Sequence, residues 1–142
     1  MLRFVWVSDD RAEIERYVEG ARYQLRIAVA LRSRQAPLVD DYMVDEVGFE
    51  GEPPLDRVER NILAGGAEHV AERLCEEIEL YGPSHMNIYF QVGDVSSATA
   101  LSSMEAFSTE VLPRVEKHFG KPIAEINPIQ LPEPKSIAMA AE

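Results

Sequence analysis

Residues 64–115 constrain the fold of this chain more than any other stretch. They run from a Gly-Gly turn into an amphipathic helix that Gly82 and Pro83 end, and then into a short strand, a capped turn and a second long helix. Strands that alternate with helices run parallel and are joined by right-handed crossovers. The stretch therefore predicts an α/β fold, and it has the form of the last units of a repeating strand-helix architecture.

Hydrophobic spacing places the elements of this stretch. Apolar residues at every third or fourth position predict a helix over 67–81. Met86–Val92 alternates between two faces and predicts a strand. The last helix is expected to kink near Thr109, because Pro113 lacks a backbone N–H. Its predicted buried stripe consists of Leu101, Met104, Phe107, Val111 and Val115.

The first half of the chain adds a second strand and the helix that follows it. Residues 3–7 are mostly β-branched or aromatic, and Ser8, Asp9 and Asp10, each a good helix N-cap, follow directly before the next segment. This helix carries an apolar stripe that a sheet or another helix must cover. The stripe consists of Ile14, Val18, Ala21, Leu25 and Ala28. The predicted core is thus a pair of parallel strands surrounded by amphipathic helices.

Two segments interrupt the pattern. Residues 35–54 contain Pro, Gly and aromatic residues within an acidic stretch. Long loops of this kind often bind something, so we interpret this one as a lid or subunit contact, with a plain surface excursion as the alternative. A short helix is expected from Leu55, ending before Gly65. Residues 127–142 are Pro-rich and aperiodic, which predicts a mobile tail.

The composition limits the partners of the chain. With 142 residues it is one domain by size, over residues 1–126, and it is shorter than the ~250 residues of a complete α/β barrel. The formal net charge of -11 opposes binding to nucleic acid or to an anionic membrane. The longest uncharged apolar run, 27–31, is too short to span a bilayer. We expect a soluble, cytoplasmic protein.

The sequence lacks the familiar catalytic and cofactor motifs. It has no GxGxxG, no phosphate-binding loop ending in Lys-Ser or Lys-Thr, no HExxH and no GxSxG. Its histidines, His69, His85 and His118, are too scattered to predict a metal site. The single cysteine, Cys75, lies on an apolar helix face and is interpreted as a small buried side chain.

Two features remain as candidates for binding. Residues 65–67 begin a helix whose free N–H groups suit a phosphate, with an ordinary loop-to-helix junction as the alternative. Tyr89 and Gln91 lie on the more polar face of the predicted strand. If that strand belongs to an α/β barrel, both side chains lie near its C-terminal end, where that fold places its active sites. The alternative role for the pair is to fill the barrel interior.

Five phrases of the sequence occur together in one known family. They are RFVWVSDDRAEIE, YQLRIAVALRSRQ, LAGGAEHVAERLCEEIE, SHMNIYFQVGD and SMEAFSTEVLPRV, and they cover most of residues 3–115. In this order they resemble the C-terminal part of the bacterial luciferase-like flavin-dependent monooxygenases. GGAEHVAERL and SMEAFSTEVLPR are the most specific. The family commonly has Pro where Ala67 stands, a departure that leaves the helix prediction intact.

The resemblance implies a partial (β/α) barrel that consists of the last strand-helix units. Tyr89 and Gln91 would line the mouth of its cavity, and residues 35–54 would form the variable lid region. The implied cofactor is FMN or reduced flavin, with a deazaflavin in some branches, for oxygen activation or hydride transfer. No residue here matches the family's flavin-phosphate or catalytic-base segments, so we carry over no catalytic residue.

Two strands are too few for a stable sheet. Self-association or a complementing barrel chain is expected to complete the fold. The sequence leaves three hypotheses. The chain is a segment of a luciferase-like flavin oxidoreductase that is incomplete for catalysis, a non-catalytic barrel remnant that acts as a homo-oligomeric interaction module, or an incomplete gene product that exposes apolar faces and aggregates.

Overall fold

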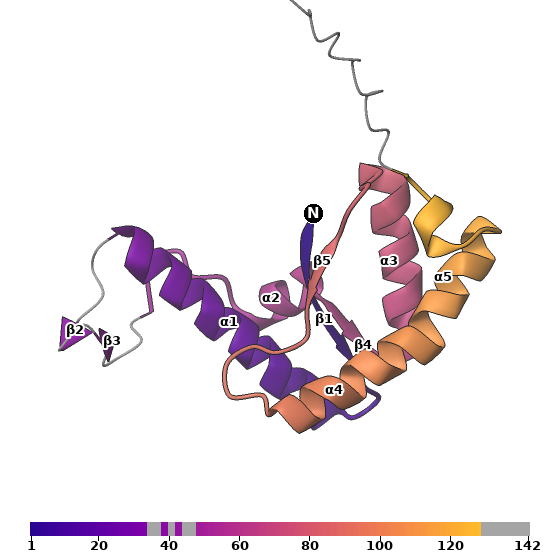
Figure 1. The fold of residues 1–142 in the computed structure, drawn as a ribbon. Coiled ribbons are helices and arrows are strands. Elements are labelled where there is room, and N and C mark those ends of the chain that lie inside the picture. The colour runs from indigo at the N-terminus through magenta and orange to yellow at the C-terminus, as the bar shows by residue number, and fades with distance from the viewer. Residues whose placement is uncertain (34–37, 40–41, 44–47, 129–142) are drawn as a thin grey trace, which may run out of the picture.

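The computed structural model describes residues 1–33, 38–39, 42–43 and 48–128, and these form a mixed α/β fold. At its centre is a parallel sheet in the order β4-β1-β5 (Figure 1). The strands are β1 (Leu2–Val7), β4 (Leu63–Gly65) and β5 (Asn87–Tyr89). The two outer strands meet different halves of β1, because Leu63 pairs with Val5 whereas Asn87 pairs with Leu2.

Helices make up most of the remaining structure. They are α1 (Arg11–Ser33), α2 (Leu55–Asn61), α3 (Ala67–Tyr81), α4 (Ser97–Ala106), the π-helical turn η1 (Phe107–Val111), α5 (Leu112–Phe119) and the 3-10 turn η2 (Ile123–Glu125). Two short strands, β2 (Leu38–Val39) and β3 (Tyr42–Met43), pair antiparallel beyond the end of α1.

Both faces of the sheet are covered by helices. Successive side chains of a strand point to opposite faces, and in β1 these are Val5 and Val7 on one face and Trp6 on the other. Val5 and Val7 belong to a buried cluster with residues of α3, η1 and α5. Trp6 belongs to a second cluster with residues of α1 and α2. The central strand is therefore buried on both sides, as is typical of parallel sheets.

The predicted core of two strands is wrong, because the sheet has a third strand, β4. β4 is three residues long, ends in Gly65 and begins almost directly after α2, so no alternating pattern marked it. The chain order of the strands is also not the spatial order, since β1 lies between β4 and β5. This order, with helices on both faces, is that of a doubly wound sheet.

β5 is shorter than the strand predicted over Met86–Val92. Its last pair with β1 is Phe4 with Tyr89. At this point the hydroxyl of Tyr17 reaches the strands from α1 and donates a hydrogen bond to the carbonyl oxygen of Tyr89. Beyond Tyr89 the chain leaves β1 and turns toward α4. The end of the strand was misplaced because the residue that meets it comes from a distant helix.

The helix predicted over 67–81 is confirmed, and Gly82 ends it in the left-handed conformation with φ 53°. The stripe predicted for the last helix is wrong at its start, because Leu101 and Met104 are exposed. The π-helical turn η1 covers Thr109, where the kink was predicted, and it ends two residues before Pro113. A π-helical turn changes the hydrogen-bonding pattern just where proline removes a donor.

α1 extends beyond the sheet it covers (Figure 1). Ile14, Val18 and Ala21 are buried as predicted, but Leu25 and Ala28 are exposed because that half of α1 has no strand beneath it. Residues 35–37, 40–41 and 44–47 of the predicted lid and residues 129–142 of the predicted tail lie outside the described residues. Within the described part, no helix is long and apolar enough to cross a membrane.

Candidate functional site

Open α/β sheets bind ligands beyond the carboxyl ends of their strands, where neighbouring strands continue into different connections. In this protein β1 and β5 are such neighbours. β1 continues into Ser8–Asp10 and then α1, and β5 continues into Phe90–Ser96 and then α4. β4 continues directly into Gly66 and α3 at the same edge. We therefore take this carboxyl edge as the candidate site.

The N-terminus of α1 is occupied by side chains of its own segment. Asp10 accepts a hydrogen bond at Oδ1 from the N–H of Ala12, at 2.8 Å. Ser8 Oγ accepts from the N–H of Asp10 at 3.1 Å and donates to Glu13 Oε2 at 2.7 Å. Such capping satisfies helix N–H groups that have no partner in the helix. An incoming anion would meet two carboxylates here.

The N-terminus of α3 faces a carboxylate as well. Gly66 precedes α3 and has no side-chain cap. A Cβ atom added to Gly66 would lie 2.3 Å from Asp9 Oδ1, so the carboxylate of Asp9 lies directly against this glycine. Negative charge is favourable near a helix N-terminus, and Asp9 supplies it. The structure thus supports an ordinary junction at residues 65–67 and opposes a phosphate site there.

The two residues predicted to line a cavity mouth lie at this edge but in different settings. Tyr89 is 48% exposed, and its ring contacts Phe4 edge-on with centroids 5.8 Å apart. Gln91 donates from Nε2 to the carbonyl of Val95 at 3.1 Å and to Ser97 Oγ at 3.3 Å. Gln91 therefore stabilises its own loop, and Tyr89 presents its ring at the surface.

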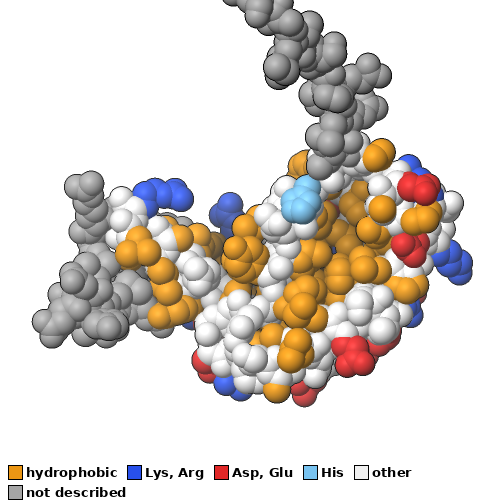
Figure 2. Space-filling model, viewed as in Figure 1, with side chains coloured by type: hydrophobic (Ala, Val, Ile, Leu, Met, Phe, Trp, Pro, Cys, Tyr) orange, Lys and Arg blue, Asp and Glu red, His pale blue; other side chains and the backbone are white. Residues whose placement is uncertain are grey.

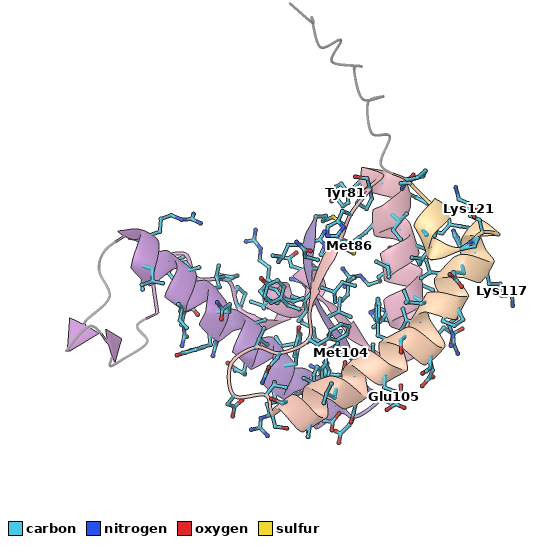
Figure 3. All side chains as sticks on the ribbon, in the orientation of Figure 1. Tyr81, Met86, Met104, Glu105, Lys117 and Lys121 are labelled. Carbon is cyan, nitrogen blue, oxygen red and sulfur yellow. The ribbon has the colours of Figure 1, made fainter. Side chains whose placement is uncertain are left out.

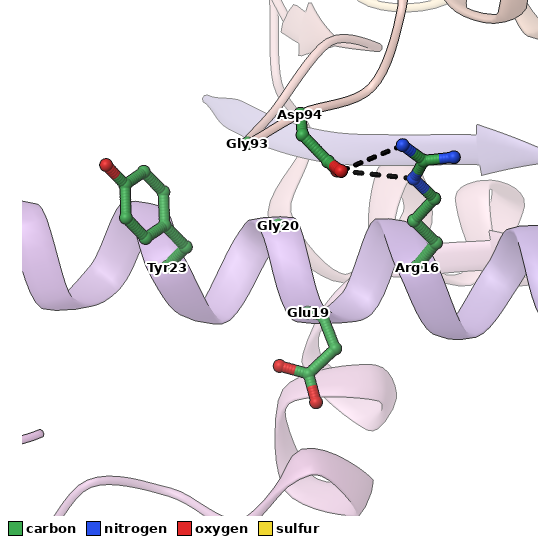
Figure 4. Close-up of a pocket in the computed structure, with 6 residues that line it drawn as sticks. All are labelled: Arg16, Glu19, Gly20, Tyr23, Gly93 and Asp94. Atoms are coloured by element: carbon green, nitrogen blue, oxygen red, sulfur yellow. Dashed lines mark hydrogen bonds and ion pairs between the residues drawn. The ribbon is translucent and has the colours of Figure 1, made fainter. Parts of the chain in front are cut away.

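The loop after β5 packs closely on α1. A Cβ atom at Gly93 would lie 2.8 Å from the Cα atom of Gly20, and Gly93 has a φ of 57°. Only glycine permits this approach and this conformation at low cost. Beside the crossing lies an open hollow of about 520 Å³ (Figure 4). It is lined by Arg16, Glu19, Gly20, Tyr23, Gly93 and Asp94.

An ion pair lines this hollow. Arg16 donates from Nη2 to Asp94 Oδ2 at 2.8 Å and from Nε to Oδ1 at 3.3 Å (Figure 4). The hydrogen bond to Arg16 lowers the pKa of Asp94, and the bond to Asp94 raises the pKa of Arg16. Both side chains are mostly exposed. The guanidinium that a ligand would meet here is already bound to a carboxylate.

A smaller cleft of about 170 Å³ lies between the end of β1 and the start of α4. Its lining includes Glu13, Ser96 and Thr99 beside Arg16. The indole of Trp6 also lines it, and its buried Nε1 has no hydrogen-bond partner among the described residues. With one carboxylate, two hydroxyls and an arginine held by Asp94, the cleft suits a small neutral polar molecule better than an anion.

Tyr17 connects this cleft to the sheet, and sequence reasoning missed it. It is fully buried and stacks on Trp6 with centroids 4.9 Å apart. Burial raises the pKa of its phenol, while a hydrogen bond from the backbone of Val5 acts in the opposite direction. Tyr17 lies three residues after Ile14 and one before Val18, so it continues the predicted stripe and could have been included.

The remaining titratable candidates form no cluster at this edge, although the ring of His69 lies there, 2.9 Å from the position of a Cβ added to Gly65. No group of three or more His, Cys, Asp or Glu residues within the described ranges could hold a metal ion. Cys75 is buried, as predicted, and burial followed by the charge of Glu79 raises its thiol pKa. His118 binds Glu79, with 2.7 Å between Nε2 and Oε1. These residues lie on α3 and α5 and add no reactive group to the site.

Comparison with known proteins gives one informative relative. No family model matches the chain, and no solved structure matches it. The chain is 34% identical over 121 residues to the uncharacterized protein y4vJ of Sinorhizobium fredii (strain NBRC 101917 / NGR234). The alignment covers 85% of this chain and 34% of that protein. The chain thus spans about a third of the length of this relative.

Proposed function

We propose that this chain is the C-terminal segment of a luciferase-like flavin-dependent oxidoreductase and is not catalytically complete alone. The family phrases across residues 3–115 carry the proposal. Further support comes from the similarity to a protein about three times as long as the matched part. Parallel strands that each lead into a helix are also the building unit of such barrels.

The barrel arrangement requires a change in strand pairing. In a closed barrel, strands that follow one another along the chain are neighbours, whereas here β1 separates β4 from β5. In the complete protein, β5 would leave β1 and pair with β4. Helices would then cover only the outer face, so α1 would no longer lie on Trp6.

The residues of this chain alone do not fit a flavin phosphate. Three helices begin at the carboxyl edge, and side chains already occupy each start: Asp10 at α1, Asp9 at α3 and Ser96 at α4. Arg16 is bound to Asp94. FMN, or a deazaflavin, would therefore be held by other parts of the complete protein. Tyr89 and Gln91 would contribute at most to the mouth of its cavity.

Complementation tests this proposal. The full chain is mixed with the part of the y4vJ protein outside the matched region, and each component is titrated with oxidised and reduced FMN. Flavin absorbance should change for the mixture and not for this chain alone. The emission of Trp6, the single tryptophan, should shift as α1 leaves it. A mixture that neither associates nor perturbs flavin would refute the proposal.

A second function is favoured by one observation. Residues 83–104 contain a single Asp and no Glu, Lys or Arg, although 27% of the chain is charged. Interface centres are depleted of charge in this way. The alternative is a non-catalytic interaction module that acts as a homo-oligomer. A folded chain that leaves flavin absorbance unchanged favours it, and oxygen-dependent flavin turnover by this chain alone excludes it.

A further inference from the structure

The outer edge of β5 is open. β5 is the last strand of the sheet, and only β1 pairs with it among the described residues. The N–H of Asn87 donates to the carbonyl of Met1 at 2.8 Å, toward β1. Adjacent residues of a strand direct their backbone groups to opposite sides. The N–H and C=O of Ile88 therefore face away from the sheet and are free to pair with another strand.

This edge lacks the usual protection against pairing. Natural proteins shield edge strands with charged side chains, bulges or proline. Residues 84–93 contain no proline and no Asp, Glu, Lys or Arg. The one charged side chain between 83 and 104, Asp94, is paired with Arg16. We call the surface formed by residues 83–104 the uncharged face.

Large apolar side chains are exposed on the uncharged face. Tyr89 is 48% exposed, Leu101 62% and Met104 45%. Figure 2 shows hydrophobic side chains gathered in a band across the middle of this side of the molecule, with charged side chains toward its rim. Met86 and Met104 lie on this side, whereas Lys117 and Lys121 lie at its outer margin (Figure 3). An apolar centre within a charged rim is the usual anatomy of a protein interface.

The charge distribution favours a second copy of the chain as the occupant. Two copies, each with a formal net charge of -11, repel each other over most of their surfaces. A twofold contact places the same surface patch against itself, so each charge in the patch would meet a like charge. The uncharged face is the part of the chain that meets itself without this cost.

We propose that two copies associate through their uncharged faces, with the two β5 strands paired antiparallel across a twofold axis. The pairing joins two three-stranded sheets into one continuous sheet, in which the backbone groups of Ile88 find partners. Leu101 and Met104 then pack against the facing copy. This inference rests on the second proposed function, the homo-oligomeric module, and involves no flavin.

The test uses two matched variants of the full chain. Leu101→Lys places a charge on the uncharged face, and Leu31→Lys places one on an equally exposed helical leucine far along α1, since the two are 62% and 60% exposed. Sedimentation velocity measures the dimer dissociation constant. We expect Leu101→Lys to raise it about tenfold or more and Leu31→Lys to leave it unchanged. Circular dichroism checks that both variants are folded.

Two further readouts distinguish the mode of contact. The amide of Ile88 should exchange with solvent more slowly as the protein concentration rises. Added salt should tighten the dimer, because it screens the repulsion between the acidic surfaces. A monomer at all concentrations, equal weakening by both variants, or an Ile88 amide insensitive to concentration would overturn the inference. Flavin binding is measured separately by absorbance. A monomer that binds flavin would overturn the proposed dimer but not the proposed flavin-dependent function.

Discussion

Removing the hydroxyl of Tyr17 is the smallest change that tests how α1 packs on the sheet. In Tyr17→Phe the ring stays stacked on Trp6, and only the oxygen is lost. This oxygen donates to the carbonyl of Tyr89 and accepts from the backbone of Val5. Because Tyr17 is 0% exposed, water cannot replace it at either group.

The expected cost follows from those two contacts. Leaving a buried backbone group short of a partner costs about 1–3 kcal/mol. The ladder between β1 and β5 can take up part of this loss, so we expect Tyr17→Phe to lower the free energy of unfolding by about 2 kcal/mol. Denaturant titration followed by circular dichroism measures the difference.

Tyr23→Phe is the matched control on the same helix. Tyr23 lies on the wall of the open hollow. Among the described residues its hydroxyl has no hydrogen-bond partner, so the substitution removes no hydrogen bond between them. The control should change the free energy of unfolding by less than about 0.5 kcal/mol. If both variants lose the same amount, the Tyr17 hydroxyl does not join α1 to the sheet.

The pH dependence provides a second check on Tyr17. Burial raises the phenol pKa above its ordinary value of 10.0, so the folded state holds this proton more tightly than the unfolded state does. The resulting stabilisation is complete below that value and is lost as the pH rises above it. The wild-type chain should lose stability there more steeply than Tyr17→Phe. Parallel curves for the two proteins would show that Tyr17 is not the group responsible.

Three further predictions concern the turn, the ion pair and the thiol. Gly93→Ala should lower the free energy of unfolding by about 2 kcal/mol more than Gly82→Ala does. The two glycines have similar positive φ values, but only Gly93 would place a Cβ 2.8 Å from Gly20. Denaturant midpoints measure the difference, and equal losses for the two variants would contradict the close packing. Arg16→Gln should raise the pKa of Asp94, because the hydrogen bond from Arg16 lowers it; a carboxyl NMR titration with an unchanged midpoint would contradict the ion pair. Cys75 should react slowly with a thiol reagent until the chain unfolds, since it is 5% exposed with a raised pKa; rapid reaction of the native protein would show that α3 opens.

The elements that could be predicted from the sequence are those governed by local spacing. The helix over 67–81 and its end at Gly82 follow from apolar periodicity and a glycine C-cap, and both are confirmed. β4 escaped prediction because a three-residue strand has no period of its own. It is recognised only through its pairing with β1. The order of the strands likewise depends on pairings between distant segments, which the spacing of residues does not encode.

At the candidate site, too, local features could be predicted from the sequence and contacts between distant segments could not. Ser8, Asp9 and Asp10 were predicted as alternative caps from their position before a helix, and Asp10 caps α1. The contact of Gly20 with Gly93 and the pair of Arg16 with Asp94 join α1 to the loop after β5, and neither segment alone signals the other. Tyr17 is the exception, because it lies on the same helical stripe as Ile14 and Val18, although the prediction left it out.

The burial of Trp6 sets a requirement for any barrel that includes this chain. Trp6 is 2% exposed and stacks on the fully buried Tyr17, under α1. In a barrel this face of β1 would turn inward and α1 would leave it. Exposing side chains of this kind costs about 1.5–3 kcal/mol each. The other strands of such a barrel would therefore have to bring an apolar interior of their own, since a polar cavity would favour the two-faced sheet that this chain already forms.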